Sequence, residues 1–461
     1  MPLFGIETEY GLAIEGSSPH TQLADAAAFI AQFDGPSFAG WDYAHETPRA
    51  DLRGFEADQL ATDPADAQWD SDEPQARWIA DRVLTNGARL YNDHGHPEYA
   101  TPECARVLDL VAHDRAGELI VRRMAKLFQG SIGRRVSVYK NNTDFHGASY
   151  GTHENYLVPR SIEFSKLAHG LVPLFICRQL FVGAGKVGSE VGRPARYQVS
   201  QRADFVSELA SVDTLYRRPI FNTRDEPHAD ADKWIRLHVI CGDANRIEWA
   251  TAMKVAMTQI AIRLIEIGEE PTWHVCSPVK AFESVSKDES FEWRMELDDG
   301  SWTTAADVLD SYLSSAEKHF VGSGAETDWV LAQWRLALGD LRNDPLTLKD
   351  RCDWAAKLAL LNQFAEAEGG WKPSTMQSLD LQYHNIDPDE SLFDALIQSG
   401  LVQSLVPEAR VQDAVSIPPN TRAQLRGNLV ADSSAQLRTI GWRRAVLEEN
   451  GAPRVIEFPV Q

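Results

Sequence analysis

The chain has 461 residues, of which 43% are hydrophobic and 24% are charged, and its formal net charge is −22. This balance is typical of a folded protein with one large domain and a small one, or with two or three ordinary domains. Nucleic-acid binding needs a basic surface, and an anionic membrane repels an acidic chain. We therefore expect neither nucleic acid nor a membrane among the partners.

The cysteine pattern points to a reducing compartment. The five cysteines are widely spaced, no two form a Cys-x-x-Cys pair, and an odd number does not complete a disulfide framework. The first residues carry neither a basic segment nor a long apolar run, and no stretch of about 18 apolar residues occurs. These features predict a cytoplasmic protein.

The first predicted elements are followed by an acidic segment. Residues 3–14 alternate apolar and polar side chains, which predicts a strand, and residues 23–33 predict a short helix. Neither period is present from 36 to 73. Between Asp42 and Glu73 there are ten Asp or Glu and only two Arg, and such a segment cannot bury much apolar surface. We expect a long loop here, of the kind that is usually functional or disordered.

Further along, helices and strands are interspersed. Residues 76–87 predict a helix that ends at Asn86-Gly87, and residues 89–93 predict a strand. Further helices are expected at 114–131, 166–182 and 250–270 and through most of 288–371, and further strands at 135–142, 148–158, 231–245 and 451–460. Because this order lacks the regular rhythm of a doubly wound sheet, it favours an α+β fold.

Several predicted strands carry ionisable side chains where a half-buried strand usually carries Val or Ile. Residues two apart on a strand share a face, so these sets project together: Glu7 with Glu9; Arg89 with Tyr91 and Asp93; Gly151 with His153 and Asn155; and Trp234 with Arg236 and His238. For one strand alone a solvated face is the simpler explanation, but four such strands together weaken it.

Carboxylates that converge need a compensating charge. Two of them about 4 Å apart repel by roughly 4 kcal/mol at an effective dielectric constant near 20. Mg²⁺ binds carboxylate oxygens and bridges to phosphates, and arginines such as Arg89 and Arg236 suit phosphate oxygens. The strand faces therefore favour a site for magnesium and a phosphate group.

Two other motifs are weaker. Asp93 with His94 and His96 resembles part of a zinc site, but no third ligand has a recognisable spacing and His-Glu-x-x-His is absent. GAGKVG at residues 183–188 fits Gly-x-Gly-x-x-Gly, but it follows a helix-like run rather than a strand, so we interpret it as a flexible loop. A Walker P-loop is absent, so any nucleotide binds through another architecture.

Longer motifs carry more information. In chain order they are GIETEYG, NGARLYNDHGHPEYATPEC, YKNNTD, GASYGTHENYLV, SQRADF, NTRDEPHADADKWIRLHVICGDAN, LDLQYHNI and PPNTRAQLRG. Together they resemble the family of Pup ligase and Pup deamidase/depupylase, from about residue 4 to about residue 430. Members of that family attach the small protein Pup to lysines, or detach it and deamidate its C-terminal Gln.

The resemblance implies a glutamine-synthetase-like fold of the α+β class. A largely antiparallel curved sheet would form a cradle for ATP and Mg²⁺, the implied cofactors, and helices would pack on its back. The implied domains are a catalytic domain of residues 1–395, in which residues 36–77 are an inserted acidic loop, and a small C-terminal domain of residues 396–461.

The resemblance also implies roles for individual residues. Asp93 is the implied catalytic aspartate. The implied metal shell is Glu7, Tyr91, Glu98, His153 and His238. The expected ATP contacts, to which the strand faces add Arg89, are Glu7, Thr8, Glu9, Tyr10, Gly11, Arg89, Ala100, Thr101, Pro102, Glu103, Asn155 and Arg236.

Two features resemble the hydrolase branch. A His directly follows Asp93 where ligases read Asp-x-Gly-Ser-His-Pro-Glu-Tyr, and residues 41–60 look like a loop that depupylases insert and ligases lack. The opening GIETEYG is more ligase-like. The implied function is an ATP- and Mg-dependent hydrolase that acts on a Pup-like modifier and its lysine-linked conjugates. An ATP-consuming ligase and a non-catalytic modifier-binding adaptor are the alternatives.

In the implied reaction ATP is a cofactor that is not consumed. Asp93 either attacks the carboxamide carbon as a nucleophile or activates a water molecule as a general base. Arg224 is a candidate for substrate contact. Because the modifier is acidic in this family, we also expect a basic groove, with scattered surface arginines as the alternative; the candidates are Arg193, Arg196, Arg202, Arg217 and Arg218.

Overall fold

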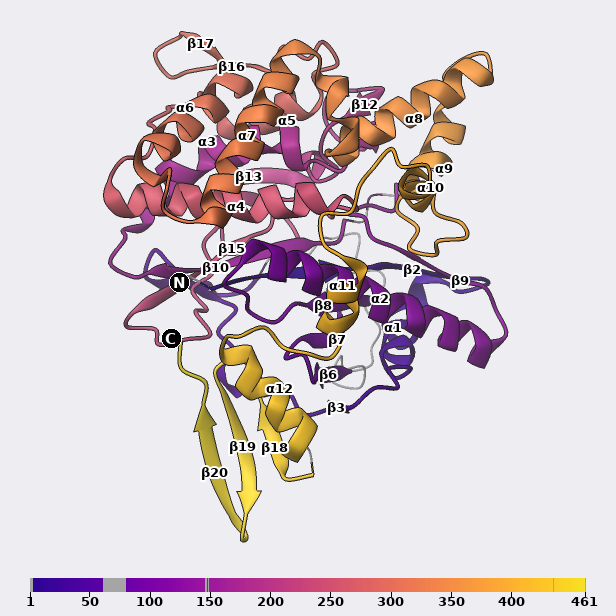
Figure 1. Cartoon of the computed structure of the whole chain (residues 1–461), viewed down its shortest axis with the longest axis vertical. Helices are drawn as coiled ribbons and strands as arrows, with labels where there is room; N and C mark the ends of the chain where they lie inside the picture. Colours follow the sequence, from indigo (N-terminus) through magenta and orange to yellow (C-terminus); the bar gives the residue numbers. More distant parts are fainter. Residues whose placement is uncertain (1–2, 61–79, 146, 148, 434, 461) are drawn as a thin grey trace.

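A seven-stranded sheet lies at the centre of the structure, a computed structural model that describes residues 3–60, 80–145, 147, 149–433 and 435–460. Its strand order is β15-β10-β1-β8-β7-β6-β3, and every neighbouring pair is antiparallel (Figure 1). The strands are β1 (Phe4–Glu9), β3 (Ser37–Phe38), β6 (Asp81–Leu84), β7 (Arg89–Asp93), β8 (His96–Ala100), β10 (Thr152–Pro159) and β15 (Trp234–Val239). This sheet confirms the predicted α+β class.

One face of the sheet is apolar and carries the main core. Phe4 and Ile6 of β1 and Tyr156 and Val158 of β10 are almost fully buried, because alternate residues of a strand point to the same face. Three helices contribute to the same core: α2 (Val107–Ile132), α3 (Phe164–Val182) and α4 (Glu248–Ile267). The helices cover this face and leave the opposite face to the polar residues.

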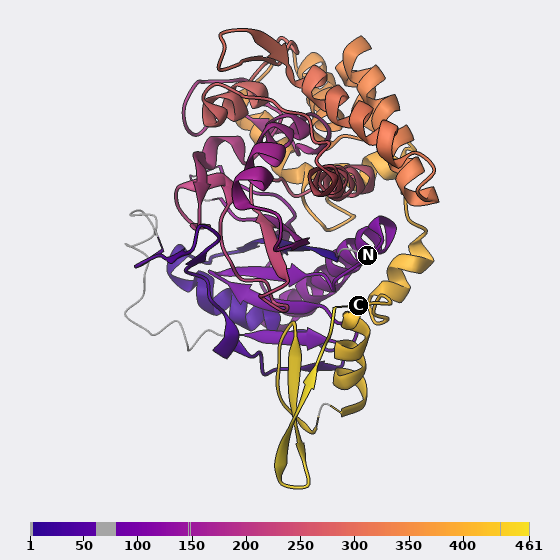
Figure 2. The same cartoon turned by 90° about the vertical axis from the view of Figure 1, so that its left-hand side faces the viewer.

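A helical layer extends the core beyond α4, at the top of Figures 1 and 2. Its buried Leu309, Trp334 and Trp354 belong to the same cluster as the sheet residues, so sheet and helices share one core. The layer contains α5 (Pro278–Ser286), β16 (Arg294–Glu296), β17 (Trp302–Thr304), α6 (Ala305–Phe320), α7 (Ala325–Asn343), η6 (Pro345–Asp350), α8 (Asp353–Ala367), α9 (Pro373–Tyr383) and α10 (Leu392–Gln398).

Smaller elements flank the sheet. A second core around Tyr10 and Phe29 holds β2 (Gly11–Ile14), which pairs with β9 (Val136–Tyr139), and α1 (Gln22–Ile30). The remaining short elements are η1 (Pro19–Thr21), η2 (Tyr43–His45), β4 (Ala50–Asp51), β5 (Phe55–Glu56), β11 (Lys186–Val187), β12 (Tyr197–Gln198), η5 (Ala203–Phe205), β13 (Val206–Ser211) and β14 (Arg218–Asn222).

The end of the chain forms a separate small layer below the sheet (Figure 1). It consists of α12 (Arg422–Ser433) and the strands β18 (Leu437–Ile440), β19 (Arg444–Glu449) and β20 (Ala452–Glu457). Its small core includes Trp41 and Val83 from the sheet side. However, Val402, Val406 and Val411, the last on α11 (Glu408–Ala414), pack in the main core. We therefore propose a domain boundary just before α12 rather than at 395/396.

The sequence predicts most of the long helices correctly and assigns one strand of the sheet to a helix. The helices expected at 114–131, 166–182 and 250–270 are confirmed as α2, α3 and α4. The helix expected at 76–87 is wrong over residues 81–84, which form β6; residues 76–79 lie outside the described residues. Asn86-Gly87 is a hairpin turn that leads into β7, and a turn of this composition also resembles a helix end.

Two expected loops contain more structure than their composition suggests. Within the acidic segment 36–77, residues up to 60 include β3, η2, β4 and β5, and residues 61–77 lie outside the described residues. The GAGKVG segment is not a helix start, as expected. It is also not a free flexible loop, because Gly183 to Val187 are buried and Lys186–Val187 pairs with Tyr197–Gln198.

We predict that Arg178→Met destabilises the fold strongly. Arg178 of α3 donates two hydrogen bonds, of 2.7 and 2.5 Å, to Glu154 of β10, and both side chains are buried. Removal of one partner leaves a buried charge uncompensated, which costs about 3–5 kcal/mol. Urea unfolding should show this loss, whereas Arg196→Met, at an exposed arginine, should cost less than about 1 kcal/mol. Similar midpoints for both variants would contradict the prediction.

Stability should also fall in mild acid through His113. Burial on α2 lowers the pKa of this histidine from 6.5 to about 4. The unfolded chain then binds the proton more readily, so the contribution of the neutral ring is full above about pH 6.5 and is lost as pH falls toward 4. His113→Leu should reduce the loss of unfolding free energy between about pH 7.5 and pH 5 by roughly 2 kcal/mol. The same change at exposed His169 should leave the pH profile unaltered.

Candidate active site

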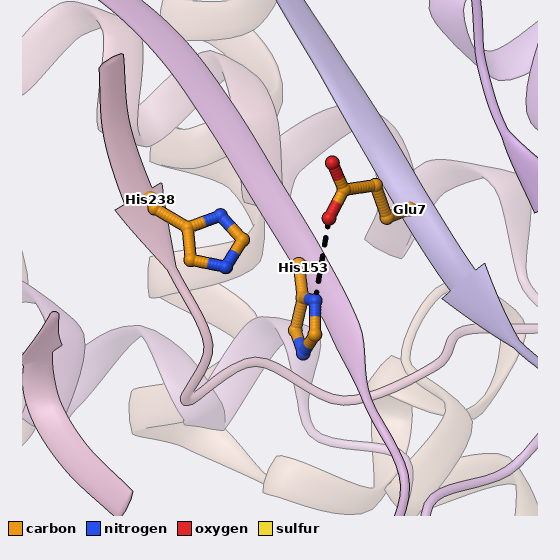
Figure 3. Close-up of side chains that lie close together, drawn as sticks. All are labelled: Glu7, His153 and His238. Carbon is orange, nitrogen blue, oxygen red and sulfur yellow. Dashed lines mark hydrogen bonds and ion pairs between the residues drawn. The ribbon is translucent and has the colours of Figure 1, made fainter. Parts of the chain in front are cut away.

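The polar face of the sheet carries a first cluster of metal-binding side chains. Ligand atoms of Glu7, His153 and His238 all lie within 4.8 Å of one another. Figure 3 shows the three side chains close together on neighbouring strands. The register produces this arrangement, because Glu7 pairs with His153 across β1 and β10, and Asn155 pairs with His238 across β10 and β15. Nδ1 of His153 is 3.3 Å from Oε2 of Glu7, and the two imidazole rings meet edge to face.

A second cluster of three carboxylates adjoins the first. Oxygens of Glu9, Asp93 and Glu98 lie within 4.8 Å of one another. Glu9 pairs with Glu98 across β1 and β8, and Asp93 ends β7 beside them. Tyr91 donates its hydroxyl to Oε1 of Glu98, and Oε2 of Glu98 is buried without a hydrogen-bond partner. One oxygen of the cluster, Oε2 of Glu98, therefore accepts no hydrogen bond from the described residues.

The four carboxylates differ in their electrostatics. Burial, reinforced by the neighbouring carboxylates, raises the pKa of Glu98 well above its ordinary value and also raises the pKa of Asp93. Burial alone would raise the pKa of Glu7 and Glu9 too, but nearby imidazoles, with Arg236 for Glu7, hold both below the ordinary value. Neighbouring positive groups therefore balance the negative charge of Glu7 and Glu9, whereas the negative charge of Asp93 and Glu98 is not fully balanced.

Two arginines border the first cluster. Arg236 donates to Asn155 at 2.8 Å, pairs with Glu226 at 3.1 Å, and lies 3.8 Å from Glu7. Nε of Arg224 is buried and has no hydrogen-bond partner within the described residues. Nη2 of Arg224 donates to the Thr214 hydroxyl at 3.3 Å, and burial, with the charge of Arg236, lowers the pKa of Arg224. Both groups suit an anionic ligand with several oxygens.

A pocket opens beside the first cluster. It encloses about 530 Å³, including the solvent at its mouth, and the C-terminal layer supplies one wall through Arg422 and Trp442. Arg422 and Arg426 both pair with Glu103, and Arg426 also lies against the Trp442 ring, which fixes this wall to the sheet. The other lining residues include Leu3, Gly5, Glu7, Ala100, Thr101, Asn155, Leu157, Pro227, His228 and Arg236.

The structure brings most of the predicted residues together. The five predicted metal-shell residues and Asp93 lie in or against the two clusters, with Tyr91 attached through Glu98. Half of the expected nucleotide contacts line the pocket: Glu7, Ala100, Thr101, Glu103, Asn155 and Arg236. Pro102 is not among the lining residues, and Glu9 belongs to the carboxylate cluster instead.

Three expected contacts have other surroundings. Thr8 is buried and alternates with Glu7 and Glu9, and Tyr10 belongs to the second core with Phe29, so neither side chain reaches the pocket. Gly11 is needed for close packing, because a Cβ there would lie 2.5 Å from the Tyr150 hydroxyl.

Arg89 does not face the pocket as a free guanidinium. Its Nε and Nη2 donate to Asp81 at 2.9 and 2.6 Å, and Nη2 also reaches the Tyr43 hydroxyl. The guanidinium is stacked between the rings of Trp41 and Tyr91. This geometry supports the position of Tyr91, and the contact of Arg89 with a nucleotide stays a prediction.

The five arginines expected in a basic groove are not equivalent. Arg202 is buried and donates to Ser149, to the Tyr150 carbonyl and to the Ile240 carbonyl, so it cannot line a surface groove. Arg217 is exposed, whereas Arg218 is partly buried and donates to the Ser149 carbonyl.

The zinc alternative gains no support, because neither His94 nor His96 belongs to a metal-binding group among the described residues.

Two members of the site have no clear signal in the sequence. Glu226, which pairs with Arg236, was visible only as part of a long motif. Trp442 lies outside every motif and reaches the pocket through the fold of the C-terminal layer.

No helix in the described ranges is long and apolar enough to cross a membrane.

Comparison with known proteins gives matches over most of the chain. A profile of the family described as Pup-ligase protein matches residues 2–446. The chain is 40% identical to the Depupylase of Acidothermus cellulolyticus, over 99% of this chain and 93% of that protein. It is 37% identical to the Pup deamidase/depupylase of Mycolicibacterium smegmatis, over 97% and 92%. It is 40% identical to the Pup–protein ligase of Micrococcus luteus, but over only 76% and 79%.

Two solved structures have the same fold. The first is the complex between Prokaryotic Ubiquitin-like Protein Pup and its ligase PafA, with a TM-score of 0.80 and 30% identity over 99% of this chain and 88% of that one. The second is PafA in complex with ADP, with a TM-score of 0.75 and 32% identity over 82% and 85%.

Proposed function

The chain belongs to the Pup-ligase protein family, and we propose that it is a hydrolase that removes a Pup-like modifier. It cleaves the isopeptide bond between the modifier and a substrate lysine, deamidates the modifier's C-terminal Gln, or does both. The observation that carries this proposal is the extent of the match. The Depupylase match covers 99% of this chain, whereas the Micrococcus ligase match covers 76% at the same identity.

The pocket is proposed as the site of ATP. It is lined by β1, β8 and β10 and closed by the C-terminal layer, and the related PafA was solved with ADP. Leu3, Leu157 and Trp442 in the lining suit a base, while Arg236, 3.8 Å from Glu7, suits phosphates. Arg236 would hold the phosphate end of the nucleotide, and Trp442 would pack against the base.

The residues of the two clusters fit Mg²⁺. Oε2 of Glu98 is a buried oxygen without a partner, and the raised pKa values of Glu98 and Asp93 reflect a lack of positive charge. Carboxylate oxygens are the ligands that Mg²⁺ takes. Glu9 and Glu98 would hold an ion at the second cluster, with Tyr91 bonded to Glu98, and Glu7, His153 and His238 would hold one at the first. When bound, the ion supplies the charge that keeps these carboxylates ionised and polarises a phosphate or carbonyl oxygen.

Asp93 is proposed as the reacting residue. Its side chain is 34% exposed, in contrast to Glu98, so a substrate carbonyl can reach it. As a nucleophile, its oxygen forms a bond to the carboxamide carbon. The C–N bond breaks, the nitrogen leaves with a proton as lysine amine or ammonia, and water then hydrolyses the anhydride. As a general base, Asp93 instead takes a proton from the attacking water.

Two alternative functions, a ligase and a non-catalytic adaptor, would require different features of the site. A ligase would spend ATP to join a modifier to a lysine, with conjugate and ADP as products. A non-catalytic adaptor would not need the two clusters, yet Glu7, Asp93, Glu98, His153 and His238 are all present and converge. The convergence speaks against the adaptor, and the coverage of the matches speaks against the ligase.

The carboxylate of Asp93 should be needed for cleavage. With a modifier–lysine conjugate, ATP and Mg²⁺, the parent chain should release the free modifier while little ATP is consumed, as gel and ADP assays measure. Asp93→Asn should lose at least about 100-fold in rate because a neutral amide neither attacks nor accepts the proton. The melting temperature should not fall, since the substitution removes a repulsive charge.

The opposite products would contradict the proposal. Conjugate formation with equimolar ADP would establish the ligase. An Asp93→Asn variant that cleaves at the parent rate would exclude Asp93 from the chemistry, whatever the reaction.

Substitution of a pocket-lining residue should weaken ATP binding, whereas substitution of a core residue should not. Trp442→Ala should weaken ATP binding by roughly tenfold, because the variant loses an aromatic wall of the pocket. Tyr10→Phe should leave the affinity within about twofold, because Tyr10 lies on the other face in the second core. Isothermal titration of both variants tests this, with thermal melting as the folding control. Equal losses in the two would contradict the assignment of the pocket.

A further inference from the structure

His96 lies beside the carboxylate cluster and has no role in the site described so far. Its Nδ1 is buried, has no hydrogen-bond partner, and lies 3.6 Å from Oε2 of Glu9. The register explains this position, because His96 pairs with Asp93 on β7 and its own strand β8 lies next to β1. Nε2 of His153 is 4.0 Å from the other Glu9 oxygen. Two imidazoles therefore face the two oxygens of one carboxylate.

Two contacts fix the His96 ring. Tyr150 stacks on it with ring centroids 4.6 Å apart and planes 26° from parallel. The side-chain nitrogen of Gln22, on α1, lies 3.3 Å from Nε2. With the Gln22 amide nitrogen as the donor to Nε2, the ring proton would be on Nδ1, toward Glu9. Neighbours outside the clusters fix the plane of the ring.

The contact with Gln22 depends on the turn between β7 and β8. Gly95 in this turn has a φ of 91°, a conformation that favours glycine. A Cβ at Gly95 would lie 2.8 Å from Cγ of Gln22, so only glycine allows α1 to approach this closely. The same short turn separates Asp93 from His96, which links the position of the ring to that of the proposed reacting carboxylate.

We propose that His96 is a positioning residue whose Nδ1–H orients the Glu9 carboxylate and so prepares the Glu9–Asp93–Glu98 cluster to bind a divalent cation. This inference rests on the proposed function, because it concerns the cation that the clusters would hold. Donors to ligating carboxylates fix their rotamers, and their loss typically costs about 10- to 100-fold in metal affinity. Tyr150 and Gln22 act through His96 in the same way.

The test is Mn²⁺ binding to the nucleotide-free full chain, measured from the electron paramagnetic resonance signal of free Mn²⁺. His96→Asn places an amide nitrogen near the position of Nδ1, His96→Gln places one near Nε2, and His96→Leu supplies neither. The Leu and Gln variants should bind about 10- to 100-fold more weakly, and the Asn variant within about threefold of the parent chain. His169→Leu, at an exposed histidine of α3, is the matched control and should bind like the parent.

Each outcome separates the inference from the proposed function. A parent chain that binds no Mn²⁺ overturns the metal site and the inference together. A parent that binds, with a His96→Leu variant of equal affinity, overturns the positioning role alone. The same conclusion follows if the Asn and Leu variants lose equal affinity at unchanged melting temperatures. Should the Leu variant not fold, the Asn and Gln variants decide, and equal affinities in these two overturn the role.

Discussion

The site depends on repulsion among carboxylates that strand register holds in place. Glu9 is paired directly with Glu98, and Asp93 ends the next strand on the same face. Each close pair repels by roughly 4 kcal/mol at an effective dielectric constant near 20, so the cluster would spread if its backbone were free. The backbone is not free, because the opposite face of the same strands is built into the main core. Apolar packing behind the sheet therefore sustains an unfavourable charge arrangement in front of it.

The imidazoles and arginines divide this arrangement into two parts. Around Glu7, a hydrogen bond to His153 and the charge of Arg236 favour the ionised carboxylate. Around Asp93 and Glu98, burial and neighbouring carboxylates favour the protonated form. A cation bound between the parts would ionise the second group and alter the first little. Cation binding and the reactivity of Asp93 would therefore be coupled, because both depend on the ionisation of these carboxylates.

Strand alternation accounts for what the sequence predicts well. The period of two places Glu7, Asp93, His153, Arg236 and His238 on one face, and the structure brings them together there. The same alternation turns the side chains of Thr8 and Tyr10 away from the pocket, because a motif of consecutive residues spans both faces of a strand.

Other features depend on contacts between distant parts of the chain. Arg202 donates to carbonyls of separate segments, Tyr150 and Ile240. Trp442 reaches the pocket from the C-terminal layer, where Glu103 pairs with two arginines of α12 more than 300 residues away. Side chains that meet across such separations leave no local pattern, so neither periodicity nor spacing indicates them.

Residues 41–60 are joined to the site by direct contacts. The backbone N–H of Thr47 donates to Glu226 at 2.6 Å, and Glu226 holds Arg236. Asp51 accepts a hydrogen bond from the Thr223 hydroxyl and forms a bridge with the backbone of Arg224. Arg236 and the backbone of Arg224 are thus supported by residues between 41 and 60. Because Glu226 holds the Arg236 side chain that lines the pocket, a displacement of Thr47 would reach the proposed nucleotide site through two contacts.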